Sequence, residues 1–489
     1  MTELLPSWGD MGNGYYRNPV LNADFSDPDV VRVGADYFMV CSDFHYMGMP
    51  VLQSADLVNW RLVGRVYGRL DIDPGYDSFQ RYGRGCWAPA LRWHGNRFFV
   101  YFCTPDEGLF VCTATNPAGP WTPPHALSRT PMWEDPCPFW DEDGRAYLGH
   151  SIVGAGPIVV HEMNPDGMSL LDEGRTVYIG KIAEGTKIYR REGWYYLVIP
   201  EGGVEAGWQT VLRAANLYGP YERRVVLATG KTTINGPHQG ALVDTPGGQS
   251  WFLHFQSRGA LGRVCHLQPV EWREGWPHIG VDGEPVEVWA KPDTPEKTEP
   301  TLPATSDDWS QPHLGWQWQW NHNPVGGAWS LADRPGHLRL RALAAPGLQQ
   351  APNTLTQRLM GPRGRIEVHL DGRGLVEGQR AGLAFLGKEE SWLALCHREG
   401  RPRLEAWTGG AVAHGPGADD VWLGADVDLE GRTRFRFSLD GRHWSFLGGD
   451  CTLEPAFWKG ARVALFTYDA QGARGPADFG PFRYEVFRD

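Results

Sequence analysis

The sequence lacks the features that mark several common functional classes. It has no apolar run long enough to span a membrane, no Cys-x-x-Cys pair and no cysteine and histidine spacing typical of a metal site. Its net charge is −12, from 46 Lys and Arg against 58 Asp and Glu, and no basic stripe offsets that balance. We therefore expect neither nucleic acid nor an anionic membrane surface as a partner.

The first residues and the cysteines point to a compartment. Residues 1–20 have neither the basic start nor the apolar centre of a secretion signal. Most of the eight cysteines lie in strand-like runs such as FVYFCTP and LFVCTAT, which favours buried, reduced thiols. Together these observations predict a cytoplasmic protein.

Helical periodicity is nearly absent, whereas aromatic residues are abundant: 23 Trp, 17 Tyr and 20 Phe. Short aromatic and β-branched runs, broken by Gly, Asp and Pro, are typical of an all-β protein. Carbohydrate binding is a second explanation, because flat rings stack on the apolar faces of sugars. With 489 residues the chain is expected to form two domains.

One pattern recurs five times in the first part of the chain, at intervals of about 50 residues. Each copy has a leading residue, a short strand, a glycine turn and an aromatic-rich strand, as in DPDVVRVGADYFMV and WAPALRWHGNRFFVYF. The leading residues are Asp27, Trp87, Asp135, Glu184 and His238, and the turn glycines are Gly34, Gly95, Gly144, Gly193 and Gly247. Such repeats are typical of the blades of a β-propeller, whose inner strands converge on one axis. The five leading residues should then form one ring, whereas five unrelated hairpins of a sandwich would scatter them.

The composition sets the domain boundaries. We assign residues 14–290 to a five-bladed β-propeller. Residues 291–308, KPDTPEKTEPTLPATSDD, hold four prolines and indicate a stiff linker. In residues 309–489 apolar and polar residues alternate, as in HLRLRAL and RFRFSLDG, with glycine-rich turns, which predicts a jelly-roll-like β-sandwich. We expect this sandwich to close one rim of a pocket in the propeller.

Three carboxylates and a histidine in one ring suit acid–base chemistry or a metal site. A metal site would be expected to have more histidines or a denser aspartate cluster. Glycoside hydrolysis needs one carboxylic acid to protonate the leaving oxygen and one carboxylate to activate water across the sugar. Different blades of one rigid propeller would provide two such groups.

The repeat segments also resemble a known family. NPVLNADFSDPDVVRVGADYFMV, WAPALRW, EDPCPFWDEDG, AEGTKIY, GPHQG and GALGRV follow one another in an order that resembles glycoside hydrolase family 43. The resemblance covers about residues 14–290, and the second domain is similar to the sandwich attached to β-xylosidases of that family. It implies a five-bladed, inverting enzyme that acts on β-xylosides and α-L-arabinofuranosides.

The resemblance implies a role for each matching residue. Asp27 matches the general base, Glu184 the general acid, and Asp135 the carboxylate that orients the acid and raises its pKa. Arg263 matches an arginine that binds substrate hydroxyls near the base. His238 matches a histidine that in several members helps hold a hydrated calcium ion in the channel, and a buried histidine without metal is the alternative. No organic cofactor is implied.

Other residues near the repeats have weaker assignments. Trp87, Phe44 and Tyr46 are candidates to line the sugar pocket, with ordinary core positions as the alternative. Asp29, Glu134 and Glu201 match no family role, and we expect Asp29 to cap the turn or to bond the backbone. The sequence departs from the usual β-xylosidase pattern at SDFHYMG and EGTK, both near the sugar, which leaves the substrate preference open.

The sequence thus predicts an exo-acting, inverting β-xylosidase that releases terminal xylose from β-1,4-xylo-oligosaccharides. An α-L-arabinofuranosidase, alone or in the same pocket, is the first alternative. A non-catalytic, lectin-like propeller and a retaining fructosidase of the five-bladed type are the others. Xylo- and arabino-oligosaccharides are the expected partners, and the sequence leaves open whether the chain forms a homo-oligomer.

Overall fold

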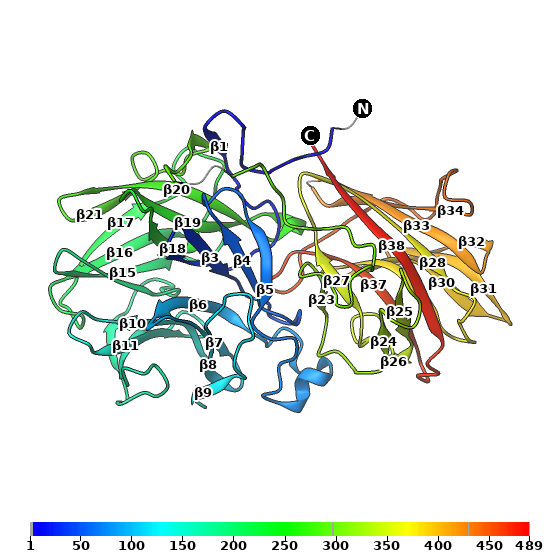
Figure 1. Cartoon of the computed structure of the whole chain (residues 1–489), viewed down its shortest axis with the longest axis horizontal. Coiled ribbons are helices and arrows are strands. Elements are labelled where there is room, and N and C mark those ends of the chain that lie inside the picture. The colour runs from blue at the N-terminus through cyan, green and yellow to red at the C-terminus, as the bar shows by residue number, and fades with distance from the viewer. Residues whose placement is uncertain (1–2, 296–297, 429, 489) are drawn as a thin grey trace.

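The computed structural model describes residues 3–295, 298–428 and 430–488, and shows two β domains side by side (Figure 1). Within these residues helical structure is confined to three short 3₁₀ turns, η1 (Pro74–Asp77), η2 (Phe79–Arg81) and η3 (Gly259–Leu261). None of the described helices is long and apolar enough to cross a membrane. The all-β prediction is confirmed.

The first domain is a five-bladed β-propeller, as the repeat predicts. Each blade is a four-stranded antiparallel sheet whose strands follow one another in sequence order. Blade 1 contains β2 (Asp29–Val33), β3 (Asp36–Val40), β4 (Pro50–Ser54) and β5 (Arg61–Arg65); blade 2 contains β6 (Trp87–His94), β7 (Arg97–Thr104), β8 (Gly108–Ala114) and β9 (His125–Ser128). Blade 3 contains β10 (Trp133–Trp140), β11 (Ala146–Ile152), β12 (Ile158–Met163) and β13 (Arg175–Tyr178); blade 4 contains β14 (Lys187–Arg191), β15 (Trp194–Glu201), β16 (Trp208–Ala214) and β17 (Glu222–Leu227). Blade 5 contains β18 (His238–Asp244), β19 (Ser250–Ser257), β20 (Arg263–Arg273) and β21 (Trp276–Ile279).

The inner strands close the ring. Strand β2 contacts both β6 of the second blade and β18 of the fifth, and β10 contacts β6 and β14. The short strand β1 (Tyr15–Arg17) pairs with β22 (Val288–Ala290), so the two ends of the propeller segment meet. The inner strand of each blade is an edge strand of its sheet, and ring closure places these short edges at the protected channel. It also brings the starts of the five inner strands together at one end of the channel.

Four of the five turn glycines fill the predicted role. Gly34, Gly95, Gly144 and Gly193 have φ between +54° and +86°, the left-handed region that glycine adopts without strain. In the fifth blade the left-handed residue is Gly248, with φ of +85°, and not Gly247. The turn of this blade is therefore formed by the second glycine of the Gly247–Gly248 pair.

The second domain is a β-sandwich of two eight-stranded sheets. One sheet contains β23 (Gln319–Trp320), β26 (Leu343–Ala344), β27 (Leu355–Arg358), β29 (Arg380–Leu386), β30 (Glu390–Arg398), β31 (Arg401–Thr408), β32 (Ala411–Gly417) and β37 (Arg462–Asp469). The other contains β24 (Trp329–Ser330), β25 (Leu338–Arg341), β28 (Arg363–Asp371), β33 (Asp420–Val427), β34 (Arg432–Ser438), β35 (Ser445–Phe446), β36 (Cys451–Thr452) and β38 (Pro476–Phe487). Alternating apolar residues such as Ile366, Val368 and Leu370 face inward and are fully buried.

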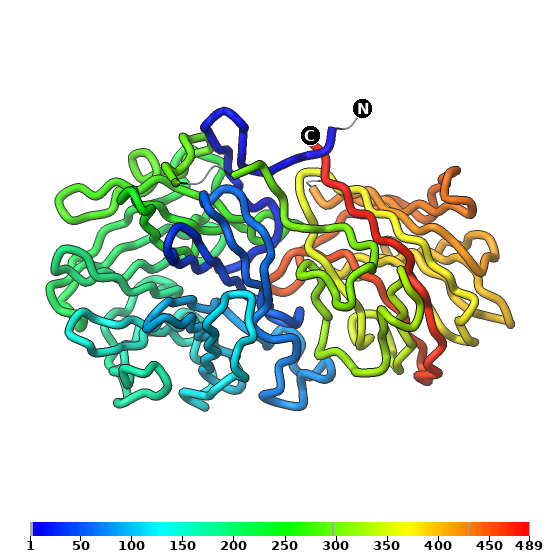
Figure 2. Tube along the Cα trace, in the orientation of Figure 1, coloured from blue at the N-terminus to red at the C-terminus, as the bar shows by residue number. Residues whose placement is uncertain are grey.

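The segment between the domains packs against both of them. Thr301 donates its backbone N–H to the Asn59 side chain of the propeller at 3.0 Å, and Asp307 pairs with Phe482 of β38. The trace in Figure 2 runs from the propeller across to the sandwich, and the first residues return along β38, where Leu4 pairs with Phe487. Residues 298–308 therefore lie against both domains.

Buried charges join the two domains. Asp24 of the propeller lies 3.4 Å from Lys459 Nζ and 3.9 Å from Arg462 Nη2 of the sandwich, and all three side chains are fully buried. Removing one partner of such a group leaves a buried charge uncompensated, which lowers the free energy of unfolding by about 3–5 kcal/mol. Gln319 adds bonds to the Tyr46 and Gly48 carbonyls at 3.1 and 2.8 Å. The sandwich is thus held in one position against blade 1.

Candidate active site

The five leading residues of the repeat meet in one pocket, as predicted. Asp27, Trp87, Asp135, Glu184 and His238 all line a cavity of about 500 Å³ at one end of the propeller channel. A cavity of this size suits a small ligand such as one or two sugar units. Arg263 and Phe44 line the same cavity.

Irregular backbone at the start of the inner strands turns these side chains into the pocket. Asp27 and Asp135 both have φ of +55°, outside the strand region. The pairing of β6, β10 and β18 with their neighbours shifts register at Trp87/Ala90, Glu134/Cys137 and His238/Gly240. Bulges of this kind re-aim a side chain at the rim of a sheet. Poor strand formers therefore stand where a strand must be broken.

Asp27 is held by two partners. Arg263 Nη1 donates to Asp27 Oδ1 at 2.7 Å, and Ser42 Oγ donates to Oδ2 at 2.6 Å. Ser42 Oγ also accepts the Ala88 N–H at 2.7 Å, which fixes the hydroxyl between blades 1 and 2. Because Asp27 is only 4% exposed, these bonds restrict its carboxylate to one orientation toward the cavity.

A second group of carboxylates, Glu134, Asp135 and Glu184, lies in the same pocket. Within the described residues, these three bring one potential ligand oxygen each to within 4.8 Å of one another. Gly185, next to Glu184, donates its N–H to Asp135 Oδ2 at 2.7 Å, which ties blade 4 to blade 3. Glu134 and Asp135 are each only 6% exposed. We call these three residues the carboxylate cluster.

Burial and mutual repulsion make the carboxylate cluster retain protons. Burial, reinforced by the charge of Asp135 and then of Glu184, raises the pKa of Glu134 to about 9. Burial, followed by repulsion from Glu184 and Asp27, raises the pKa of Asp135 to about 7. Like charges this close cannot all ionise near neutral pH, so the cluster titrates as a unit that holds at least one proton.

Glu184 behaves differently from the sequence expectation. Burial raises its pKa, but the hydrogen bond with His238 and the charge of that residue outweigh burial, so the pKa of Glu184 lies below its ordinary value. His238 Nε2 is 3.0 Å from Glu184 Oε1. In the free site Glu184 is the ionised member, and the proton of the cluster is on Glu134 or Asp135.

The channel below the pocket does not suit the calcium ion that the family resemblance implies. The residue matched to a calcium role, His238, offers nitrogen where calcium prefers oxygen, and its Nε2 is already engaged with Glu184. The buried Lys187 ammonium and the partly exposed Arg92 guanidinium lie in the channel, both within ion-pair distance of Asp29. A divalent cation would meet two fixed positive charges there.

Aromatic side chains form one wall of the pocket. The rings of Phe44 and Trp87 lie 5.6 Å apart, and Trp87 lies 6.4 Å from Phe457. Phe457 and Trp458 belong to the sandwich, in the loop between β36 and β37, and Trp458 faces the Arg263 guanidinium at 5.4 Å. The sequence interpretation missed both residues. The signal was the pair of adjacent large aromatics in AFWKG (residues 456–460), which are 58% and 42% exposed.

The assignment of Tyr46 to the pocket is wrong. Tyr46 is fully buried, does not line the cavity, and packs its ring against Arg462 of the sandwich at 4.3 Å. His45 and Tyr46 both donate their N–H groups to the Asp43 carbonyl, at 2.7 and 2.9 Å, so the chain turns here. In a turn, residues two apart need not share a face, and Phe44 and Tyr46 point to different sides.

Two other unmatched carboxylates have structural partners. Asp29 Oδ2 accepts the Leu91 N–H at 2.8 Å and pairs with Arg92, so it bonds the backbone as expected. Glu201 accepts from Tyr178 at 2.9 Å and from Arg223 at 2.5 Å, away from the pocket. Neither residue lines the cavity.

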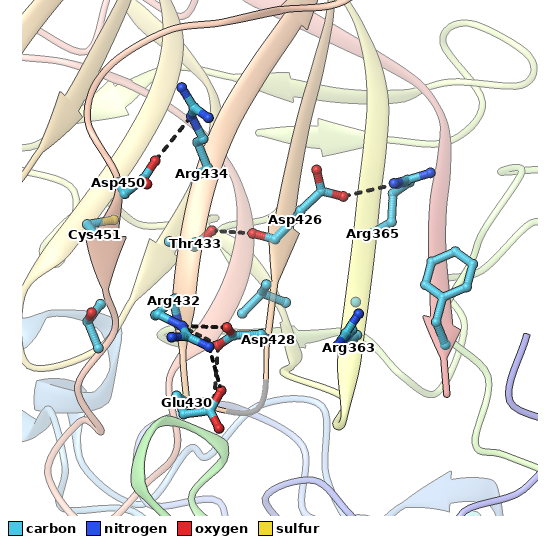
Figure 3. A pocket seen from close by; sticks show the side chains of 14 residues that line it. Arg363, Arg365, Asp426, Asp428, Glu430, Arg432, Thr433, Arg434, Asp450 and Cys451 are labelled. Atoms are coloured by element: carbon cyan, nitrogen blue, oxygen red, sulfur yellow. Dashed lines mark hydrogen bonds and ion pairs between the residues drawn. The ribbon is translucent and has the colours of Figure 1, made fainter. Parts of the chain in front are cut away.

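A larger groove of about 790 Å³ lies on the outer face of the sandwich, over β28, β33 and β34. Its charged side chains pair with one another, as Figure 3 shows: Arg365 with Asp426, Arg432 with Asp428 and Glu430, and Arg434 with Asp450. Cross-strand pairs of opposite charge stabilise a solvated sheet face. The groove is therefore an ordinary solvated sheet face, and the propeller pocket, with its convergent carboxylates, is the candidate active site.

Comparison with known proteins agrees with this division of the chain. Residues 16–277 match "Glycosyl hydrolases family 43", and residues 306–485 match "Beta xylosidase C-terminal Concanavalin A-like domain". A provisionally named beta-xylosidase of Xylanibacter ruminicola is 50% identical over 474 residues, which cover 96% of this chain and 89% of that protein. A non-reducing end alpha-L-arabinofuranosidase of Bacteroides ovatus is 32% identical over 67% of this chain and 65% of its own length. The solved structure of a bifunctional GH43-CE protein of Bacteroides eggerthii superposes with a TM-score of 0.87 at 32% identity, and the match covers 97% of this chain and 64% of that one.

Proposed function

The chain belongs to glycosyl hydrolases family 43, and from that membership we propose that it is an exo-acting, inverting β-xylosidase that releases terminal xylose from β-1,4-xylo-oligosaccharides. The observation on which the proposal rests is that Asp27 and the carboxylate cluster face one cavity from different blades. Inverting hydrolysis needs a base and an acid on opposite sides of one sugar ring. The matches to family 43 and to a β-xylosidase C-terminal domain support the same activity.

In this proposal Asp27 is the general base. Its two oxygens accept from Arg263 and Ser42, which hold the carboxylate in place to remove a proton from an attacking water. Arg263 also presents its guanidinium to the cavity beside Trp458, where it can bind a sugar hydroxyl.

Glu184 is the general acid and Asp135 the residue that orients it. In the free site burial raises the pKa of Glu184, but the contact with His238 outweighs burial and holds that pKa below its ordinary value. The proton therefore rests on another carboxylate of the cluster. Because the three carboxylates lie within 4.8 Å of one another, a proton can pass to Glu184 and then to the leaving oxygen. The hydrogen bond from the Gly185 N–H to Asp135 fixes the position of Asp135 relative to Glu184 during that transfer.

The rim of the pocket favours release of single terminal sugars. Phe457 and Trp458 of the sandwich stand beside Trp87 and Arg263, so the second domain closes one side of the cavity. A polysaccharide chain needs an open groove to pass through, whereas a closed rim admits only a chain end. The exo mode of action follows from this wall.

We propose α-L-arabinofuranosidase activity as a second function of the same pocket. A xylopyranose and an arabinofuranose can present similar hydroxyls to one set of polar groups. The alpha-L-arabinofuranosidase of Bacteroides ovatus, 32% identical to this chain, supports this second activity.

Hydrolysis of p-nitrophenyl β-D-xyloside and p-nitrophenyl α-L-arabinofuranoside tests the proposal. We expect turnover of the xyloside, and an NMR reading of the first-formed sugar should show the inverted anomer. Retention of configuration would instead favour the fructosidase type of mechanism. Binding of xylo-oligosaccharides without any turnover would identify a lectin-like protein.

Substitution of Asp27 and of Glu184 tests the assigned roles. Asp27→Ala and Glu184→Ala should each lower kcat by about 10³-fold or more while the protein remains folded, which far-UV circular dichroism checks. Glu184→Ala should lose much less activity on an aryl glycoside with a very good leaving group, because that group needs little protonation. Equal losses on the activated aryl glycoside and on xylobiose would contradict the acid role of Glu184.

A further inference from the structure

Lys187 and Asp29 form an ion pair across the propeller channel. Lys187 is the first residue of β14 in blade 4, and its Nζ lies 3.6 Å from Asp29 Oδ2 of β2 in blade 1. Blades 1 and 4 are not neighbours in a ring of five, so this contact can be made only across the central channel. Lys187 is 1% exposed and Asp29 is 0% exposed.

Arg92 of blade 2 joins the same carboxylate. Its Nη1 is 2.7 Å from Asp29 Oδ2, and its Nη2 lies 2.9 Å from Cys137 Sγ of blade 3. Side chains from the four blades 1 to 4 therefore converge in the channel below the pocket. Their formal charges are one negative and two positive, so the group has a net positive charge.

This arrangement is the reverse of a calcium site. Of the two oxygens of Asp29, Oδ1 has no hydrogen-bond partner among the described residues, so this group offers a calcium ion one free protein oxygen. The positive charges of Arg92 and Lys187 would repel a divalent cation at that oxygen. The same two charges provide what a metal ion would provide, a fixed positive charge in a buried channel.

Lys187 lies close to the carboxylate cluster through its own segment. It follows Glu184 on the stretch EGTK, whose Gly185 N–H binds Asp135 at 2.7 Å. The positive charge of Lys187 also counts among the influences that oppose burial and lower the pKa of Asp135. When Glu184 gives its proton to the leaving oxygen, the cluster gains one negative charge, and a fixed cation nearby stabilises that state.

We propose that Lys187 is the resident cation of the channel: its ammonium group takes the place of a metal ion beneath the carboxylate cluster, and the enzyme works without calcium. Lys187 is a positioning residue, because it acts through Asp135 and Glu184 and does not line the pocket. The kinetic part of this inference rests on the proposed glycosidase function, and the metal part does not.

The metal part is tested on the whole, unmodified protein. After dialysis in calcium-free buffer, elemental analysis should find less than about one-tenth of a calcium ion per chain, and neither EDTA nor calcium chloride should shift the melting temperature by more than about 1 °C. A full equivalent of calcium that survives dialysis, with a lower melting temperature in EDTA, would overturn the inference. These readouts do not depend on activity.

The kinetic part compares Lys187→Met with Lys187→Arg. Methionine keeps the length of the chain and removes the charge, so kcat on xylobiose should fall at least about tenfold, with a smaller loss on an activated aryl xyloside. Arginine keeps the charge and should restore kcat to within about threefold of the wild type. The exposed Lys181 lies in the same loop, and Lys181→Met should leave both rates unchanged.

The outcomes separate the two proposals. Equal losses on xylobiose and on the aryl xyloside, or a Lys187→Arg variant as slow as Lys187→Met, would show a merely structural ion pair and overturn the inference. A wild-type protein inactive on both substrates would overturn the proposed function, and the metal measurements would then still decide whether calcium occupies the channel.

Discussion

Replacement of Glu134 by glutamine should stabilise the protein in a strongly pH-dependent way. Glu134 is 6% exposed and lies in the carboxylate cluster, and burial with repulsion from Asp135 and Glu184 raises its pKa from 4.5 to about 9. Glutamine has the same shape, no charge, and a carbonyl that can accept the weak Ser151 bond, which is 3.5 Å long in the wild type.

The direction of the effect follows from proton linkage. Between pH 4.5 and about 9 the folded protein keeps a proton on Glu134, whereas the unfolded chain releases it. The folded state binds more protons in this window, so the free energy of unfolding falls as the pH rises. Each pH unit above the ordinary pKa costs about 1.4 kcal/mol, so the cost at pH 7 is about 3 kcal/mol. Glu134→Gln removes that cost and is neutral at every pH.

Differential scanning calorimetry of both proteins over a pH series measures the effect. For a propeller of this size, about 3 kcal/mol corresponds to a rise of about 5 °C in the melting temperature at pH 7. The two melting temperatures should coincide near pH 4.5 and diverge as the pH rises. A Glu134→Gln protein that melts below the wild type at pH 7, or a difference of equal size at low and high pH, would refute the assigned burial of this carboxyl.

Two further predictions concern residues around the pocket. Ser42→Ala removes the hydroxyl that orients Asp27 and binds the Ala88 N–H. Since hydrogen bonds to charged groups contribute about 1.5–3 kcal/mol, kcat/KM on the aryl xyloside should fall about tenfold or more. An unchanged kcat/KM would show that Arg263 alone positions Asp27. Phe457→Ala should raise KM for xylobiose about tenfold with kcat within about threefold, because it removes one aromatic wall and no reacting group. Phe446→Ala, an exposed aromatic elsewhere on the sandwich, is the matched control and should change neither constant, and a Phe457→Ala enzyme with wild-type KM would contradict closure of the pocket by the second domain.

The repeat explains why so much of the site could be predicted from the sequence. Propeller geometry turns a spacing along the chain into a ring in space, so the shared offsets alone were enough to bring Asp27, Asp135 and Glu184 together. Those three positions are fixed by periodicity, which a single sequence displays. The contact of Arg263 with Asp27, present at 2.7 Å, followed instead from the family resemblance.

The residues that escaped prediction depend on contacts that no local pattern encodes. Phe457 reaches the pocket from a loop of the other domain, and the ring that it faces, Trp87 of β6, lies far away in the sequence. Tyr46 was misplaced because a turn at Asp43 breaks the alternation of a strand. The direction of the Glu184 pKa shift depends on how close His238 lies, which only the folded structure gives.

The loop between β36 and β37 ties the chemistry of the pocket to the joint between the domains. Phe457 and Trp458 face the substrate cavity, and the next residue, Lys459, is the buried partner of Asp24. A chimera that exchanges the sandwich between relatives would therefore change part of the pocket wall and the buried counter-ion of Asp24 in one step. The two domains should be engineered as one unit.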